Sequence, residues 1–133
     1  MDIFVTVSWI AVIVAAVVRI AIGAVWYAPP VFGKQWQVAT GVEQGPSEMP
    51  QAIAVQALGS LVMAYVLAQV IGHYETDGLL AGALVGILMW VGFVATIMLP
   101  GVLFEKRSLG FFGIYSGYQL VTLAIMGAII GAL

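Results

Sequence analysis

Residues 3–28 of the chain read IFVTVSWIAVIVAAVVRIAIGAVWYA, and this stretch decides the fold. Arg19 is its only charged residue. An apolar run of this length is long enough, at about 1.5 Å of rise per helical residue, to cross a hydrocarbon core of about 30 Å. The stretch therefore predicts a membrane-spanning helix with one arginine inside it. The main question is what surrounds that arginine.

The composition of the whole chain indicates the same environment. Hydrophobic residues make up 63% of the 133 residues and charged residues only 8%, with a mean hydropathy of +1.13. Soluble domains lie far from these values. The net charge of −2 comes without a basic cluster, which excludes nucleic-acid binding. Because the chain has no cysteine, disulfides and thiolate metal sites are excluded as well. We expect an integral membrane protein in contact with lipid, without a cofactor.

Three further apolar runs follow, at residues 51–72, 78–104 and 109–133. Together with residues 3–28 they predict an all-α bundle of four transmembrane helices, with short loops and a single domain over residues 1–133. None of the runs has the alternation of a β-barrel strand.

The connections add two details to this fold. The segment after the first helix, through Phe32 and Trp36, suggests a short interfacial helix, or alternatively a plain polar loop. PPVFGK at 29–34 is similar to PGVLFEK at 100–106, which suggests two parallel helical-hairpin repeats.

The basic residues predict the orientation of the bundle. Lys34, Lys106 and Arg107 all flank one side of the predicted spans, and the opposite side has no lysine or arginine. Positive residues favour the cytoplasmic side of a membrane. Both termini should therefore lie on the non-cytoplasmic side.

Glycines at a spacing of four predict close helix contacts, because small residues let helix backbones approach one another in lipid. The predicted packing positions are Gly78, Gly82 and Gly86 on the third helix and Gly113 and Gly117 on the fourth. Gly127 and Gly131 repeat the spacing further along the fourth helix. The contacts could lie within one chain or between copies. Because four short helices bury little surface, we expect a homo-oligomer.

Every predicted helix can bring a polar side chain to the depth of Arg19, about 13 Å inside the span. The predicted polar layer consists of Arg19, Gln56, Thr96, Tyr115 and Gln119, with Tyr118 near its edge. One interpretation is structural: the arginine reaches toward the headgroups or is held by neutral partners. The second is an anion-binding cavity for a carboxylate, a phosphate or a lipid headgroup. A third is pairing with a carboxylate of another subunit or partner protein.

Several kinds of chemistry have no support in the sequence. All acidic residues lie outside the predicted spans, so the buried carboxylate that a proton-coupled cation exporter needs is absent. His73, near Glu75 and Asp77, would make a poor metal site. Neither a nucleophile beside a base nor a phosphate-binding glycine loop is visible, so we expect no enzyme.

Two stretches carry a resemblance to a known family. GAVWYAPPVFGKQW at 23–36 and GFVATIMLPGVLFEKRSLGFFGIYSGYQLVTLAIMGAI at 92–129 resemble a small bacterial membrane family, domain of unknown function 1761 (DUF1761). The resemblance implies the same four-helix fold in the bacterial inner membrane, and it implies no activity. The family tends to have Ser, Thr and His at the positions of Ala28, Ile97 and Gln119. Because glutamine cannot titrate, a proton relay through the layer is not expected here.

From these observations we expect the polar layer around Arg19 to bind or pass a small anion or an anionic lipid headgroup. The alternative is a non-catalytic structural or accessory subunit. Such a subunit would oligomerise, or dock on a larger membrane complex, through its glycine-rich helix faces.

Overall fold

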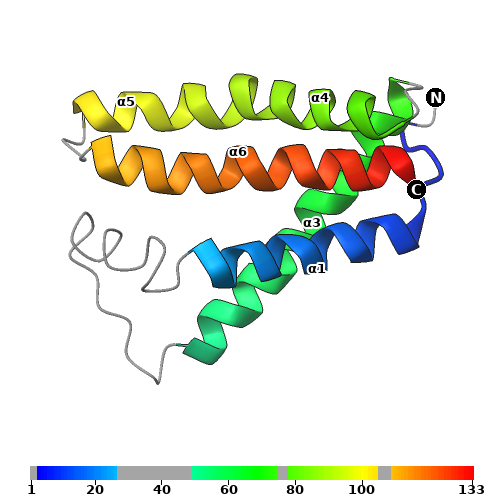
Figure 1. Cartoon of the computed structure of the whole chain (residues 1–133), viewed down its shortest axis with the longest axis horizontal. Helices are drawn as coiled ribbons and strands as arrows, with labels where there is room; N and C mark the ends of the chain where they lie inside the picture. Colours follow the sequence, from blue (N-terminus) through cyan, green and yellow to red (C-terminus); the bar gives the residue numbers. More distant parts are fainter. Residues whose placement is uncertain (1–2, 27–48, 75–77, 105–108) are drawn as a thin grey trace.

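The computed structural model describes residues 3–26, 49–74, 78–104 and 109–133. Its elements are α1 (Trp9–Trp26), α3 (Met49–His73), α4 (Leu79–Met89), a π-helical turn η2 (Trp90–Ala95), α5 (Thr96–Phe104) and α6 (Leu109–Ala132). α4, η2 and α5 follow one another as one continuous rod (Figure 1). The described residues thus form four rods, each long and apolar enough to cross a membrane. For these residues, the prediction of an all-helical fold with four such helices is confirmed.

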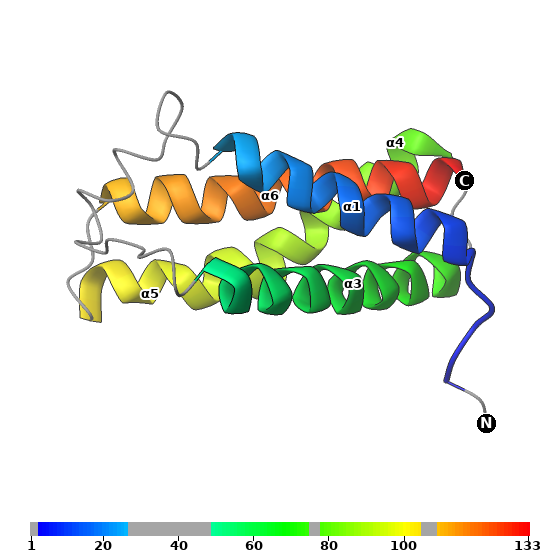
Figure 2. The same ribbon diagram turned by 90° about the horizontal axis from the view of Figure 1, so that it is seen from below.

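The rods run alternately in opposite directions. The start of α1, the end of α3, the start of α4 and the end of α6 all lie at one end of the molecule (Figure 1). α1 packs against both α3 and α6, and α4 packs along α6. Figure 2 shows the same arrangement from below. Sequential helices are therefore antiparallel, as the short connections before α4 and before α6 require.

The first helix is shorter than the sequence predicts, because residues 3–8 are not helical. Ser8 marks the helix start: its Oγ accepts a hydrogen bond from the Ala11 amide at 3.3 Å, as a serine N-cap does. Val5 bonds to α3 instead of to its own helix. Its amide donates to Oε1 of Gln69 at 2.8 Å, and its carbonyl accepts from Nε2 of Gln69 at 3.0 Å. The side chain of Gln69 thus replaces the helical hydrogen bonds of this segment.

Most of the core lies in one half of the bundle. We call the half with the start of α1, the end of α3, α4 and the end of α6 the terminal half, and the other the distal half. The main buried cluster lies in the terminal half: Val12, Ala15, Ala16, Ala64, Leu67, Ala68, Ile71, Val85, Leu123 and Met126. In the distal half, residues 51–59 of α3 contain no buried side chain, and α5 buries none either. The bundle is therefore tightly packed at one end and loosely packed at the other.

Glycines set the distance between α4 and α6. A Cβ atom on Gly82 would overlap the carbonyl group of Gly127, and one on Gly86 would overlap that of Leu123. The amide of Gly78 even donates to the carbonyl of Gly131 on α6, at 2.9 Å. Gly78 also has a φ of 106°, which side chains rarely tolerate. Gly78, Gly82 and Gly86 thus all contact α6 of the same chain.

The two glycines predicted at the start of the fourth span behave differently. A Cβ on Gly113 would meet no other atom within 4 Å, so Gly113 is not a packing position in the described part of the chain. A Cβ on Gly117 would lie 3.4 Å from the ring of Trp26, which is ordinary contact with a side chain. The backbone contacts of α6 come instead from Gly127 and Gly131. The reason is that α6 meets α4 closely only in the terminal half.

These contacts predict opposite effects for two glycine-to-alanine substitutions. Gly86→Ala should lower the free energy of unfolding by about 1–3 kcal/mol, because its methyl group overlaps backbone that cannot move alone. Gly113→Ala, the matched control on α6, should be neutral or stabilising by about 0.5–1 kcal/mol, because alanine favours a helix over glycine. Thermal unfolding of both variants in detergent measures the difference. Equal unfolding temperatures would contradict the close approach of α4 and α6.

Candidate functional site

Arg19 lies inside the bundle, with only 4% of its surface exposed. Its Nη1 donates to Oγ of Ser60 on α3 at 2.8 Å, and its Nη2 donates to Oε1 of Gln119 on α6 at 2.9 Å. The side chain therefore stays among the helices and does not extend to the end of α1. A single arginine joins α1, α3 and α6.

Tyr118 covers one face of the guanidinium. The Cζ atom of Arg19 lies 5.0 Å from the centroid of the Tyr118 ring, within the range of a cation–π contact. The tyrosine hydroxyl donates to the carbonyl of Arg19 at 2.9 Å and accepts from Nε2 of Gln56 at 3.1 Å. Gly23, one turn further along α1, leaves room for this hydroxyl: a Cβ there would lie 2.8 Å from it. We call Arg19, Ser60, Tyr118 and Gln119, with Gln56 at their edge, the Arg19 cluster.

The charge of the Arg19 cluster is not balanced within the described residues. Asp, Glu and Lys do not occur in the described ranges, and Arg19 is the one arginine there. A guanidinium stays charged in proteins, and Ser60 and Gln119 offer it only neutral acceptors. The Nε atom of Arg19 is buried, and no described residue accepts its proton. A buried cation with an unused donor would be stabilised by an anion.

The cluster lies at the boundary between the two halves of the bundle. Ser60 is completely buried, whereas Gln56, one turn closer to the start of α3, is exposed. Residues 51–55, which precede Gln56 on α3, are all exposed. On the other side of Arg19, the buried cluster begins with Ala16 and Ala64. The Arg19 cluster therefore borders the loosely packed distal half on one side and the main buried cluster on the other.

The structure brings together part of the predicted polar layer. Gln119 contacts Arg19 directly, and Gln56 reaches it through Tyr118. Tyr115 lies one turn before Gln119 and is 36% exposed. Thr96 does not join the layer: it is exposed, and its hydroxyl donates to the carbonyl of Gly92 at 2.7 Å. That bond occupies the hydroxyl within its own helical rod. The ligand-binding role of these residues stays a prediction.

Ser60 is the member of the cluster that the sequence reading missed. It follows Gln56 by one helical turn and so shares its face of α3, which is the signal that could have identified it. The sequence predicts Tyr118 near the edge of the layer, whereas in the structure its ring covers the guanidinium and the residue is 2% exposed. Thr122 is also buried, and its hydroxyl donates to the carbonyls of Tyr118 and Gln119 at 2.8 and 3.2 Å. Its hydroxyl therefore bonds within α6 and not to Arg19.

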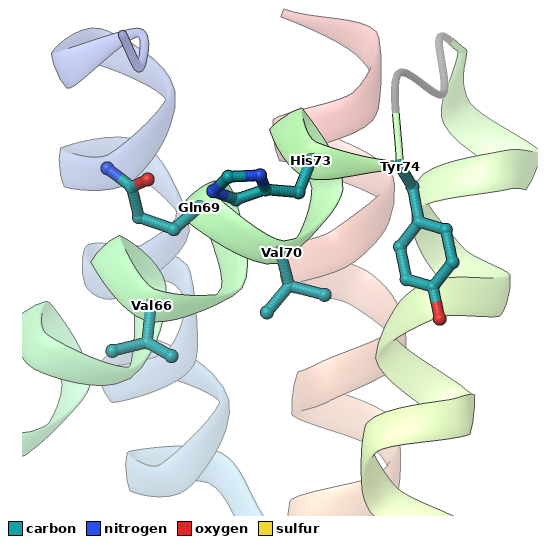
Figure 3. A pocket seen from close by; sticks show the side chains of 5 residues that line it. All are labelled: Val66, Gln69, Val70, His73 and Tyr74. Atoms are coloured by element: carbon teal, nitrogen blue, oxygen red, sulfur yellow. The ribbon is translucent and has the colours of Figure 1, made fainter. Parts of the chain in front are cut away.

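A second polar cluster lies at the terminal end of α3. Gln69, besides its two bonds to Val5, donates to the hydroxyl of Tyr65 at 3.0 Å, and Nε2 of His73 lies 2.5 Å from the carbonyl oxygen of Ile3. The tyrosine ring stacks on Trp9. A shallow groove of about 290 Å³ is lined by Val66, Gln69, Val70, His73 and Tyr74 (Figure 3). Because the amide of Gln69 is already bonded, we interpret this cluster as the attachment of the N-terminal segment.

The described residues contain no group of three or more His, Cys, Asp or Glu side chains that could hold a metal ion. The weak metal site considered at His73 would also need Glu75 and Asp77, which lie outside the described ranges.

A family model described as "Protein of unknown function (DUF1761)" matches residues 10–131 of the chain. The match extends over all four rods and confirms the family resemblance of the sequence. No curated protein and no solved structure matches the chain. The comparisons therefore supply a family but no activity.

The fit between Gly23 and Tyr118 predicts a compensating pair of substitutions. Gly23→Ala should lower the free energy of unfolding by about 1–3 kcal/mol, because its methyl group pushes against the tyrosine hydroxyl. Tyr118→Phe should cost about 1 kcal/mol through its lost hydrogen bonds. The double variant should be more stable than the sum of the two single-variant losses predicts, because phenylalanine lacks the hydroxyl oxygen that clashes with the new methyl group at position 23.

A double-mutant cycle of thermal or denaturant unfolding measures this coupling. Gly59→Ala is the matched control, because a Cβ on Gly59 meets nothing within 4 Å. Strict additivity of Gly23→Ala and Tyr118→Phe would contradict the position of the tyrosine hydroxyl.

Proposed function

The chain belongs to the DUF1761 family, and from its Arg19 cluster we propose that it is a four-span membrane protein that binds a small anionic group within the membrane. One observation carries the proposal. Arg19 is a buried permanent cation without a carboxylate among the described residues, and its Nε has no acceptor there. Ser60, Gln119 and Tyr118 orient the guanidinium, and Gln56 lies at the edge of the site.

The surface of the rods supports insertion in a bilayer. Large apolar side chains point outward on several helices, including Ile10, Val55 and Leu103, which are each at least 70% exposed. Such surfaces are unfavourable in water and suit acyl chains. The basic residues Lys34, Lys106 and Arg107 favour a cytoplasmic distal half. We therefore place both termini on the outer side of a bacterial inner membrane.

The energetics of the arginine favour an anionic ligand. A guanidinium at the centre of a membrane helix costs roughly 2.5–3.5 kcal/mol on insertion scales. Neutral acceptors such as Ser60 and Gln119 recover part of this through hydrogen bonds but leave the charge in place. An anion would cancel the charge and accept from Nε at the same time.

The packing favours access from one side. The distal half buries few side chains, whereas the terminal half is closed by the buried cluster and by the contact between Gly82 and Gly127. This arrangement suits a binding site that opens toward the distal side. Passage of the anion would need the terminal half to open, so binding is the first proposal and transport is one use of it.

A structural or accessory role is the second candidate. Arg19 joins three helices, and residues 51–59 and α5 leave an unburied surface that a second copy or a larger complex could cover. Docking through Gly82 and Gly86 is not available, because α6 of the same chain occupies that face. An oligomer would therefore form through another surface.

Arg19→Gln separates the two candidates. If the cluster binds an anion, anion-dependent stabilisation, about 2.7 kcal/mol at a concentration of 100 times Kd, should disappear, while assembly stays intact. Thermal unfolding in a series of salts and anion flux into liposomes are the measurements. Arg19→Lys, which keeps the charge, is the matched control and should retain part of the stabilisation.

The structural candidate predicts another pattern for Arg19→Gln. Co-purifying partners or oligomer size should then change, and liposomes of the pure protein should show no anion flux. An unchanged salt dependence in Arg19→Gln would refute anion binding at this residue.

A further inference from the structure

The buried polar groups of the Arg19 cluster that have no hydrogen-bond partner among the described residues are donors, not acceptors. Arginine has no acceptor, so Oε1 of Gln119 must face Nη2, and the amide N–H groups of Gln119 point elsewhere. Oγ of Ser60 accepts from Nη1, which leaves the serine proton to donate. Within the described residues, each of these two side chains makes one hydrogen bond, and Nε of Arg19 makes none. A site with surplus donors and a cation selects an acceptor with negative charge.

The charge of the ligand follows from the charge of the site. The described ranges contain one permanent cation, Arg19. A monoanion would bring the buried pair to neutrality, whereas a dianion would leave one negative charge in a medium of low dielectric constant. An uncompensated buried charge is strongly unfavourable. The site therefore favours monovalent over divalent anions.

The size of the ligand follows from burial. Arg19 is 4% exposed, Ser60 is fully buried and Gln119 is 8% exposed. A lipid phosphodiester carries ester groups on both sides of its charged oxygens, so α1, α3 and α6 would have to separate widely to admit it. A small ion needs only local movement, and the loosely packed distal half lies next to Gln56.

These three observations together point to one class of ligand. We infer that the Arg19 site binds a small monovalent anion, of the size of chloride, nitrate or formate, through Nε of Arg19, the hydroxyl of Ser60 and the amide of Gln119. The inference rests on the proposed function and specifies the charge and the size of the anion that the site binds. Ser60 has a double role in it, because its oxygen orients the guanidinium while its proton is donated to the anion.

The first test compares salts on the wild-type protein. The full chain is purified in a neutral detergent, and its thermal unfolding is followed during titration with sodium chloride, nitrate, formate or sulfate. The changes in unfolding temperature that the same salts cause in Arg19→Gln are subtracted from those of the wild type, because sulfate stabilises proteins without binding a specific site. The three monoanions should give a saturable rise in unfolding temperature, and sulfate should give none. Saturation by sulfate at the same concentration as chloride would overturn the charge argument.

The second test concerns the donors. Ser60→Ala should raise the half-saturating chloride concentration about tenfold, the effect of one hydrogen bond to a charged group. Ser116→Ala is the matched control: Ser116 is also buried, but its hydroxyl donates to the carbonyl of Phe112 on its own helix. Equal effects of the two substitutions would overturn the role of Ser60. If Ser60→Ala does not fold, Ser60→Thr, which keeps the hydroxyl, should bind chloride like the wild type.

The third test separates the ion from a lipid headgroup. Nanodiscs of phosphatidylcholine are compared with nanodiscs that contain phosphatidylglycerol, in chloride and in its absence. If phosphatidylglycerol stabilises the wild type over Arg19→Gln and chloride does not, the inference of a small ion is overturned and anion binding stands. If neither chloride nor phosphatidylglycerol distinguishes the wild type from Arg19→Gln, both proposals fail.

Discussion

The guanidinium of Arg19 is the constraint on which the arrangement of the helices depends. It cannot lose its proton, and acyl chains cannot solvate it. In the structure three helices converge on it, and Ser60 and Gln119 supply the acceptors from α3 and α6. The ring of Tyr118 covers the remaining face, and Gly23 makes that position possible. The register of α1 against its neighbours is thus tied to one side chain.

The two halves of the bundle use different local chemistry. In the terminal half, glycine and alanine let backbones meet, and α4 lies so close to α6 that Gly78 and Gly131 form a backbone hydrogen bond. In the distal half, the rod changes to a π-helical turn, and Pro100 cannot donate to the carbonyl one turn earlier. α5 also buries no side chain. Small residues occur in both halves, but only in the terminal half do they meet a neighbouring backbone: a Cβ on Gly82 or Gly86 would overlap α6, whereas one on Gly59 or Gly113 would meet nothing within 4 Å.

The sequence predicted the elements better than their contacts. Apolar runs set the number and approximate length of the helices, because lipid leaves few alternatives for the backbone. The first helix still started late, because Gln69 bonds to Val5 from another helix, which no local pattern announces. Gln119 lies at the same depth in the span as Arg19, and the contact predicted from this depth is present in the structure. It could not place Thr96, because depth does not say which way a side chain points around its helix. The sequence does not predict Ser60 as a member of the layer, because a single small hydroxyl in an apolar run is common in membrane helices and does not by itself indicate a polar contact.

The remaining question is why a charged residue joins these helices, when a neutral one could make the same connections. A glutamine can bridge Ser60 and Gln119 by hydrogen bonds, and well-packed neutral side chains often stabilise a protein more than a buried ion does. The guanidinium adds a desolvation cost and an Nε donor that no described residue uses. Structural connection therefore explains the hydrogen bonds of Arg19 but not its charge. A bound anion, as proposed above, would account for both, because it would take the unused donor and remove the electrostatic penalty. Joining the helices requires only neutral hydrogen bonds, but the site also contains a positive charge and an unused Nε donor. That excess is the physical basis for proposing Arg19 as a binding residue.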